Sequence, residues 1–204
     1  KNSIHNDDCM NSVKASFMLL QTYKEFPNDE QFFSSFVIRD MYNMRTRNYV
    51  LSRLENYDNK ASINIGNYTI EHIMPQNKNL SEEWQKELGD NSKEIQKMYI
   101  HTIGNLTLTA YNSEMSDHSF KEKKNMEGGF KESALRLNKY VVSVSEWNEE
   151  HIKERAKQLC DKALKIWPYP DLTDEVLESY KPDENTPQEY SLETYDMNSL
   201  SKTL

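Results

Sequence analysis

The sequence predicts an α+β fold that is mostly α-helical, with one two-stranded antiparallel hairpin flanked by N- and C-terminal helices. Two short segments, 63–70 and 100–109, alternate or are rich in β-branched residues, which favours strands. Elsewhere, apolar residues recur every three or four positions, which is the period of a helix. These observations indicate a small hairpin braced by helices.

The N-terminal part, residues 9–57, has the helical period throughout. Pro27, Asn28 and Asp29 mark a break between two of its helices. The segment 45–57 is expected to be a further helix, with four large residues available to a core: Tyr49, Leu51, Leu54 and Tyr57.

Four more helices are expected around and after the second strand. Residues 80–88 have a serine and an acidic first turn near their start, which favours a helix inserted between the strands. Segments 112–124 and 130–140 follow the second strand as separate helices. Residues 145–167 form a long amphipathic helix that ends at proline, with one apolar stripe of Ile152, Ala156, Leu159, Ala163 and Ile166.

Charge divides the chain unevenly. The net charge is −8, and residues 168–204 alone carry −7, so the rest is close to neutral. We therefore expect three parts: a helical part over 1–57, a domain over 58–167 that contains the hairpin and the long C-terminal helix, and an acidic linker over 168–204 that includes the possible start of a further domain. No run of 18 apolar residues is present, which predicts a cytoplasmic protein without a membrane segment.

The first candidate site residues are Glu71 and His72, at the end of the first predicted strand. Neighbouring side chains of an extended chain point to opposite faces, so one can hold a hard metal ion while the other faces a water molecule. Pro75 then turns the chain into a loop. Taken alone the pair is a weak signal, because a histidine beside a glutamate is more often an ordinary surface or core residue.

Two asparagines complete the pattern. Asn105 in Gly104–Leu108 is either a turn residue or an amide that hydrogen-bonds the segment carrying His72. Asn112, at the start of the next helix, is either an N-cap or an oxygen ligand to the metal held by Glu71.

Together these pieces resemble a known family. The strings EHIMPQ and IGNLTLTAYNSEMSDHSFKEKK, followed by a helix that ends in Ile-Trp-Pro, are similar to the HNH nuclease superfamily and its ββα-metal core. The chain is a close match to one branch of this superfamily: residues 45–168 look like the HNH domain of GmrSD-type, modification-dependent (type IV) restriction endonucleases. The same elements also look like the HNH domain of CRISPR effector nucleases. The chain departs from some HNH enzymes in having no CxxC zinc pair.

The resemblance implies a one-metal phosphodiester hydrolase. His72 would be the general base, because a histidine can accept a proton near neutral pH. Glu71 and Asn112 would hold Mg²⁺ or Mn²⁺, which prefer oxygen ligands. Asn105 would keep the His72 loop in register.

The remaining candidates are basic residues. A lysine of the Phe-Lys-Glu-Lys-Lys string is expected to act in catalysis, and we assign Lys124, with Lys123 as the other choice. Lys121, Lys123 and His101 are possible DNA contacts. The alternatives are that lysines at a helix C-terminus are favoured by the helix dipole alone, and that His101 is packed between sheet and helix.

These expectations predict a DNA endonuclease, the effector domain of a larger restriction or anti-phage defence protein that acts on modified or foreign duplex DNA. An N-terminal nucleotide-hydrolysing sensor domain would lie outside this chain, which has no GxxxxGK[ST] loop, and a homo-oligomer is possible. The alternatives are a non-catalytic helical scaffold with a vestigial site, and an RNA nuclease with the same chemistry.

Overall fold

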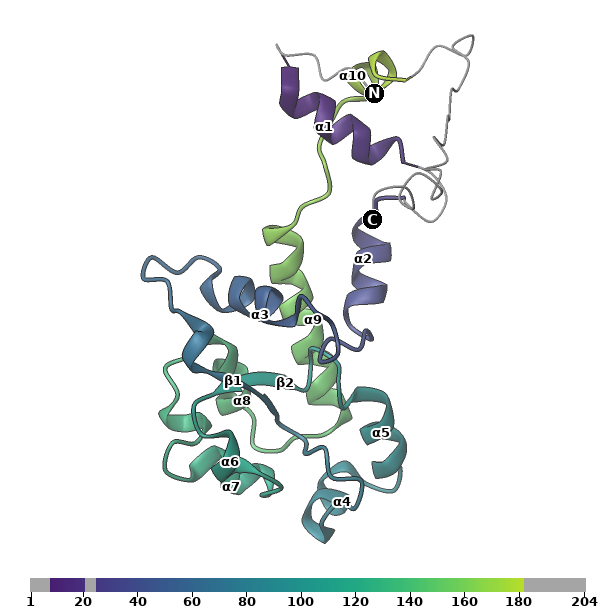
Figure 1. Ribbon diagram of the computed structural model, residues 1–204. Coiled ribbons are helices and arrows are strands. Elements are labelled where there is room, and N and C mark those ends of the chain that lie inside the picture. Colours follow the sequence, from purple (N-terminus) through teal and green to yellow (C-terminus); the bar gives the residue numbers. More distant parts are fainter. Residues whose placement is uncertain (1–7, 21–24, 182–204) are drawn as a thin grey trace, which may run out of the picture. The chain divides into compact units, whose positions relative to one another are not determined.

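The computed structural model describes residues 8–20 and 25–181 of the 204-residue chain (Figure 1). The chain divides into two compact units, one formed by Pro27–Tyr169 and the other by the segments on either side of it. The smaller unit contains α1 (Cys9–Met18) and α10 (Asp174–Ser179). Its two segments touch where Lys14 Nζ donates a hydrogen bond to the Asp171 carbonyl at 3.1 Å. The expected start of a further domain, at 190–204, lies outside the described residues.

The larger unit is mostly helical and contains one hairpin, so the predicted α+β class is confirmed. The hairpin pairs β1 (Thr69–His72) with β2 (Leu106–Thr109) in antiparallel register, with Glu71 opposite Thr107 and His72 opposite Leu106. All four residues of β2 are buried. Its helices are α2 (Asp29–Phe36), α3 (Arg47–Asn56), α4 (Glu82–Leu88), α5 (Ser92–Tyr99), α6 (Asn112–Met115), α7 (Phe120–Asn125), α8 (Lys139–Ser143) and α9 (Glu149–Ile166).

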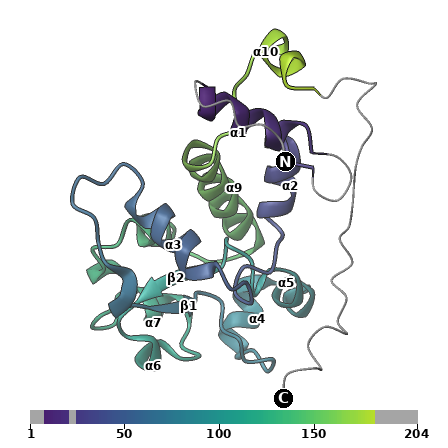
Figure 2. The same ribbon diagram turned by 45° about the horizontal axis from the view of Figure 1, so that its top comes forward.

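The hairpin lies between two groups of helices. Helices α3 and α9 lie on one side of it, and α6 and α7 lie on the other (Figures 1 and 2). Leu106 and Leu108 of β2 pack into a core with Leu51 and Leu54 of α3 and with α9. A second core gathers Trp84 of α4, helices α5 and α7, and Trp147. Helix α9 contributes to both cores, because Ile152 lies in the second and Leu159 in the first.

Gly104 permits the close approach of α9 to the segment that leads into β2. A Cβ atom at this position would lie 2.4 Å from the Ile152 carbonyl oxygen, and real Cβ contacts are never this short. The glycine is therefore required by packing against α9 and not by an unusual backbone angle.

Several predicted elements differ from the structure. The expected strand 63–70 is a 3-10 turn at Ile65–Asn67 followed by β1, and the expected strand 100–109 is regular only from Leu106. The expected helix 112–124 is interrupted at Ser116, which has a φ of 35°, and the capping box of Ser119 and Glu122 then starts α7.

Two further differences concern helices. The segment 130–140 is not one helix but two 3-10 turns, Phe130–Glu132 and Arg136–Asn138, followed by α8. Helix α5 was not predicted. None of the helices in the described residues is long and apolar enough to cross a membrane.

Candidate functional site

Strand β1 places Glu71 and His72 side by side in the chain and on opposite faces of the hairpin. Both side chains are buried, with 4% of each residue exposed. Burial of two polar side chains at one strand end requires partners on both faces, since an unpaired buried polar group is costly. Each face supplies a different partner.

On the Glu71 face the partner is Lys123 of α7. Its ammonium nitrogen lies 2.5 Å from Glu71 Oε1 and 2.9 Å from the His72 carbonyl oxygen, and the residue is fully buried. Burial raises the pKa of the Glu71 carboxyl, and the Lys123 charge opposes that rise. Burial likewise lowers the pKa of Lys123, opposed by Glu71. The pair brings a positive charge from α7 directly onto the carboxylate.

On the other face His72 meets His101 and Tyr42. His72 Nε2 lies 3.1 Å from His101 Nδ1, and the Tyr42 ring lies edge-on to the His72 ring with centroids 4.5 Å apart. Burial, together with the neighbouring His101 and Lys123, lowers the pKa of His72 to about 3, while Asp40 acts in the opposite direction. The imidazole of His72 is therefore neutral at neutral pH.

His101 is itself held in place by the segment before α3. Its carbonyl oxygen accepts hydrogen bonds from the backbone N–H groups of Met41, at 2.9 Å, and Tyr42, at 3.2 Å. Its ring stacks on Tyr42, with centroids 5.2 Å apart and an interplanar angle of 13°. The N-terminal part of the larger unit thus fixes the ring that contacts His72.

Asn105 is fully buried and joins the segment before β2 to the segment after β1. Its Oδ1 accepts hydrogen bonds from Met74 N–H at 2.8 Å and from Trp147 Nε1 at 3.1 Å. Its Nδ2 donates to the carbonyls of Met74 at 3.0 Å and Ile100 at 3.1 Å. Both amide atoms are used, and the chain that leaves His72 is fixed through Met74.

Asn112 opens α6 and reaches back to β1. Its Nδ2 donates to the Ile70 carbonyl at 2.7 Å, so the side chain lies beside the strand that carries Glu71. The amide nitrogen is the donor in this bond, so the amide oxygen Oδ1, which is an acceptor, is left to bind a cation or a hydrogen-bond donor.

The structure does not bring every candidate to this group. Lys124 Nζ donates to the Val144 carbonyl at 2.5 Å and lies over the Phe120 ring, away from Glu71. Lys121 is exposed. Of the three lysines, Lys123 is the one in contact with Glu71.

Other residues at the site were not identified from the sequence. Asp117 raises the pKa of Glu71, so its carboxylate lies near the site, and it accepts a hydrogen bond from Asn77 Nδ2 at 2.8 Å. Tyr42 and Trp147 contact His72 and Asn105 from segments remote in sequence. The capping box at Ser119 was a readable signal for the start of α7, whereas nothing in the sequence around Tyr42 or Trp147 pointed to the site.

The side-chain oxygens of Glu71 and Asn112 are of the kind that a hard cation such as Mg²⁺ would take as ligands. The described residues contain no group of three or more His, Cys, Asp or Glu side chains that would enclose a metal. Mg²⁺ is often held by one or two carboxylates, with waters and substrate phosphate as its other ligands. The Glu71 carboxylate and the Asn112 Oδ1 are a donor set of that sparse kind.

Comparisons with known proteins identify a family but no individual relative. No curated protein and no solved structure matches the chain. Residues 26–162 match the family described as GmrSD restriction endonucleases, C-terminal domain. The match covers more than half of the chain, and this chain belongs to that family.

Proposed function

We propose that the chain is a metal-dependent HNH-type endonuclease domain that hydrolyses phosphodiester bonds of DNA. The observation that carries this proposal is the placement of Glu71 and His72 on opposite faces of one strand end, with Asn112 bonded beside Glu71 and Asn105 bonded behind His72. Membership in the restriction endonuclease family supports the same reaction class.

The proposed base is His72. If His72 Nε2–H donates to His101 Nδ1, the lone pair of the imidazole lies on Nδ1, where it can accept a proton from water. Because the imidazole is neutral, no prior deprotonation is needed. A bound phosphate would favour the imidazolium that forms, since a nearby negative charge stabilises it.

Glu71 and Asn112 are the proposed ligands of Mg²⁺ or Mn²⁺. When bound, such an ion supplies positive charge to the phosphate oxygens and to the leaving oxygen. Asn105 keeps the chain after His72 in position through Met74. Lys123, rather than Lys124, is the lysine that we assign to the site, where it holds the Glu71 carboxylate.

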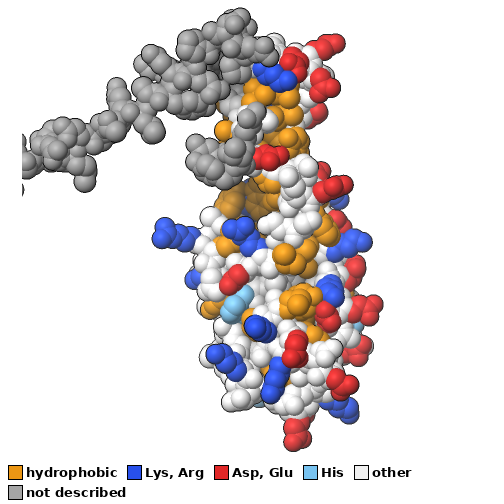
Figure 3. Space-filling model, turned by 90° about the vertical axis from the view of Figure 1, so that its right-hand side faces the viewer, with side chains coloured by type: hydrophobic (Ala, Val, Ile, Leu, Met, Phe, Trp, Pro, Cys, Tyr) orange, Lys and Arg blue, Asp and Glu red, His pale blue; other side chains and the backbone are white. Residues whose placement is uncertain are grey.

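We assign the recruitment of this domain to DNA to another part of the protein. Residues 1–167 carry a net charge of −1. Basic and acidic side chains are intermingled on the face of the larger unit seen in Figure 3. Affinity for DNA depends strongly on phosphate contacts from lysine and arginine, so this surface favours weak binding. We therefore propose that a nucleotide-hydrolysing sensor domain outside this chain brings the site to modified or foreign duplex DNA in the cytoplasm.

The test is a plasmid-nicking assay with Mg²⁺ or Mn²⁺. His72→Ala should lower the rate by about 10²- to 10⁴-fold, the usual contribution of a general base. His118→Ala is the matched control, because His118 is exposed and its ring contacts Glu122 rather than the site. Nicking by His72→Ala at the wild-type rate would refute the assignment. To test the RNA nuclease alternative, single-stranded RNA replaces the plasmid as the substrate under the same conditions, and its cleavage is measured.

One observation favours a second candidate, a non-catalytic scaffold. The Lys123 ammonium already supplies a cation to Glu71. Calorimetric titration with Mn²⁺ separates the two functions: a nuclease site binds Mn²⁺ and loses that binding in Glu71→Gln and Asn112→Leu. A scaffold shows no such dependence.

A further inference from the structure

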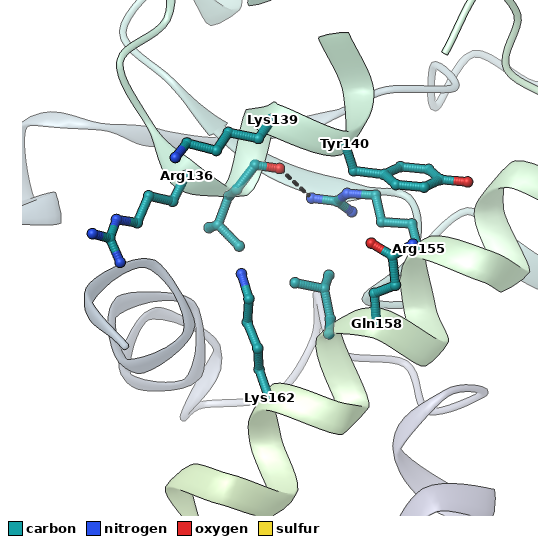
Figure 4. A pocket seen from close by; sticks show the side chains of 8 residues that line it. Arg136, Lys139, Tyr140, Arg155, Gln158 and Lys162 are labelled. Atoms are coloured by element: carbon teal, nitrogen blue, oxygen red, sulfur yellow. Dashed lines mark hydrogen bonds between the residues drawn. The ribbon is translucent and has the colours of Figure 1, made fainter. Parts of the chain in front are cut away.

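A second group of charged residues lies away from the candidate site, in a pocket between α9 and the segment 136–140. The pocket has a volume of about 220 Å³, and its walls include four basic side chains, Arg136, Lys139, Arg155 and Lys162. Figure 4 shows Arg155 and Lys162 reaching the pocket from positions two turns apart on α9. Lys139 and Arg136 lie at the other wall, where the Arg136 guanidinium points away from Arg155 and donates to the Tyr57 and Asp58 carbonyls. The lining contains no carboxylate.

Arg155 is the buried member of this group, with 1% of the residue exposed. Its Nη1 donates to the carbonyls of Ile103 at 2.9 Å and Gly104 at 2.7 Å, and its Nη2 donates to the Leu137 carbonyl at 3.2 Å. Its Nε is buried and has no hydrogen-bond partner among the described residues. Burial lowers the pKa of Arg155 to about 9. A guanidinium in the interior with only carbonyl partners is costly, since buried charges normally have an ionic partner.

The other three cations add to this unbalanced charge. In the described ranges 8–20 and 25–181, no ion pair joins any of the four to a carboxylate. Burial lowers the pKa of Lys162, Glu55 raises it, and the three other cations of the pocket lower it further. The Glu55 carboxylate is already engaged, because it accepts hydrogen bonds from the backbone N–H groups of Arg136 at 2.8 Å and Leu137 at 2.9 Å.

We propose that this pocket binds a small dianion, either inorganic phosphate or the terminal phosphate of a phosphomonoester. Guanidinium groups and lysine ammonium groups are the usual protein ligands of phosphate. The pocket is smaller than the roughly 300–1,000 Å³ of drug-sized ligand sites, which favours a phosphate with at most a small organic group.

The depth of Arg155 determines which kind of phosphate fits. To reach a guanidinium that is 1% exposed, the phosphate has to enter the pocket end-on. A free phosphate or a terminal phosphate can do so, whereas a phosphodiester in the middle of a duplex is flanked by nucleotides on both sides. Tyr140 and Gln158 also line the pocket, but the Tyr140 hydroxyl points away from it and lies 3.3 Å from His151 Nδ1, and the Gln158 amide donates to Glu154 Oε1 at 3.0 Å (Figure 4). The contacts to the phosphate are therefore assigned to the cations.

This site is separate from the proposed nuclease site but shares a structural element with it. The carbonyls that Arg155 binds belong to the two residues directly before Asn105, whose amide fixes Met74. Binding at the pocket does not require catalysis, so the inference can be tested without reference to cleavage.

The experiment uses the full chain and inorganic phosphate as the first probe, at constant ionic strength set with chloride. Calorimetry should show saturable binding, and the unfolding temperature should rise with phosphate, because a ligand that binds only the folded state stabilises it. Lys162→Gln should weaken phosphate binding at least tenfold. Lys157→Gln, which removes the same charge from the opposite side of α9, should leave it unchanged.

Further arms identify the source of the phosphate. A nucleoside 5′-monophosphate tests a small phosphomonoester, and a short duplex with a 5′-phosphate, compared with the same duplex carrying a 5′-hydroxyl, tests a terminal phosphate of DNA. Tighter binding of any of these, lost in Lys162→Gln, supports the proposal and names the ligand. Absence of saturable phosphate binding, or equal losses in Lys162→Gln and Lys157→Gln, overturns it. Lys139→Gln provides an independent variant on the other wall.

Discussion

The ammonium of Lys123 and the carboxylate of Glu71 lie 2.5 Å apart in the interior of the larger unit. The same ammonium donates to the His72 carbonyl, so one side chain from α7 holds both the side chain and the backbone of the strand end. Such a contact fixes the position of the carboxylate at the cost of removing two charges from water.

Replacing Lys123 by methionine should destabilise the protein by about 3–5 kcal/mol, because the variant leaves a buried carboxylate without its partner. The free energy of unfolding is measured by urea denaturation. Lys121→Met, on the exposed side of α7, should change it by less than about 0.5 kcal/mol. The double variant Glu71→Gln/Lys123→Met should be more stable than Lys123→Met alone, and equal stabilities would argue against a buried ion pair.

Replacing His101 by phenylalanine should reduce DNA nicking about 10- to 100-fold, the usual effect of losing a group that orients a functional side chain. The aromatic stack on Tyr42 is retained, but the nitrogen 3.1 Å from His72 Nε2 is lost. The variant leaves the buried His72 Nε2 without its partner, so the free energy of unfolding should fall by about 1–3 kcal/mol. Nicking is therefore measured well below the unfolding temperature of the variant, which separates this effect from misfolding. Unaltered nicking would mean that His101 does not orient His72.

Replacing Asn105 by leucine should cost at least about 3 kcal/mol of stability. The variant leaves two groups of Met74, the Ile100 carbonyl and the Trp147 indole N–H without their partner, and each buried unsatisfied group costs roughly 1–3 kcal/mol. Asn125→Leu is the control, because Asn125 is exposed and makes one bond within α7. Similar stabilities of the two variants in urea would contradict the central role of Asn105.

The two cysteines should differ in reactivity. Cys9 is exposed, whereas Cys160 is fully buried in α9 and burial raises the pKa of its thiol to about 11. Because the thiolate is the reactive form, iodoacetamide at pH 8 should modify Cys9 alone in the native protein and both cysteines in urea. The modified cysteines are identified by mass spectrometry. Rapid native labelling of Cys160 would show that α9 is not packed as described.

The sequence predicts four polar residues of the candidate site, and their roles in metal binding and catalysis stay predictions. Glu71, His72, Asn105 and Asn112 were selected by their order along the chain, and the hairpin brings all four to one end of β1. The sequence also predicts the long helix α9, because its apolar residues recur at helical spacing and form one buried face. The order of the polar residues and the long helix α9 can be predicted because both depend on sequence pattern within a short segment.

The features that could not be predicted from the sequence depend on contacts between segments that are remote along the chain. The backbone at Arg136 and Leu137 turns where the Glu55 carboxylate accepts their N–H groups, and no local pattern in 130–140 reveals that partner. The choice between Lys123 and Lys124 depends on which face of α7 meets β1. His101 and Tyr42 come together only because the backbone before α3 bonds to the His101 carbonyl.

The connection between the two strands has a consequence for folding kinetics. Residues 73–105, a connection of 33 residues that includes α4 and α5, separate the paired strands. At about 0.6 kcal/mol per doubling of length, closing this loop costs roughly 2.4 kcal/mol more than a two-residue turn. We expect the two strands to pair only after α4 and α5 have collapsed against their core, which makes the pairing of β1 a late step on the folding pathway.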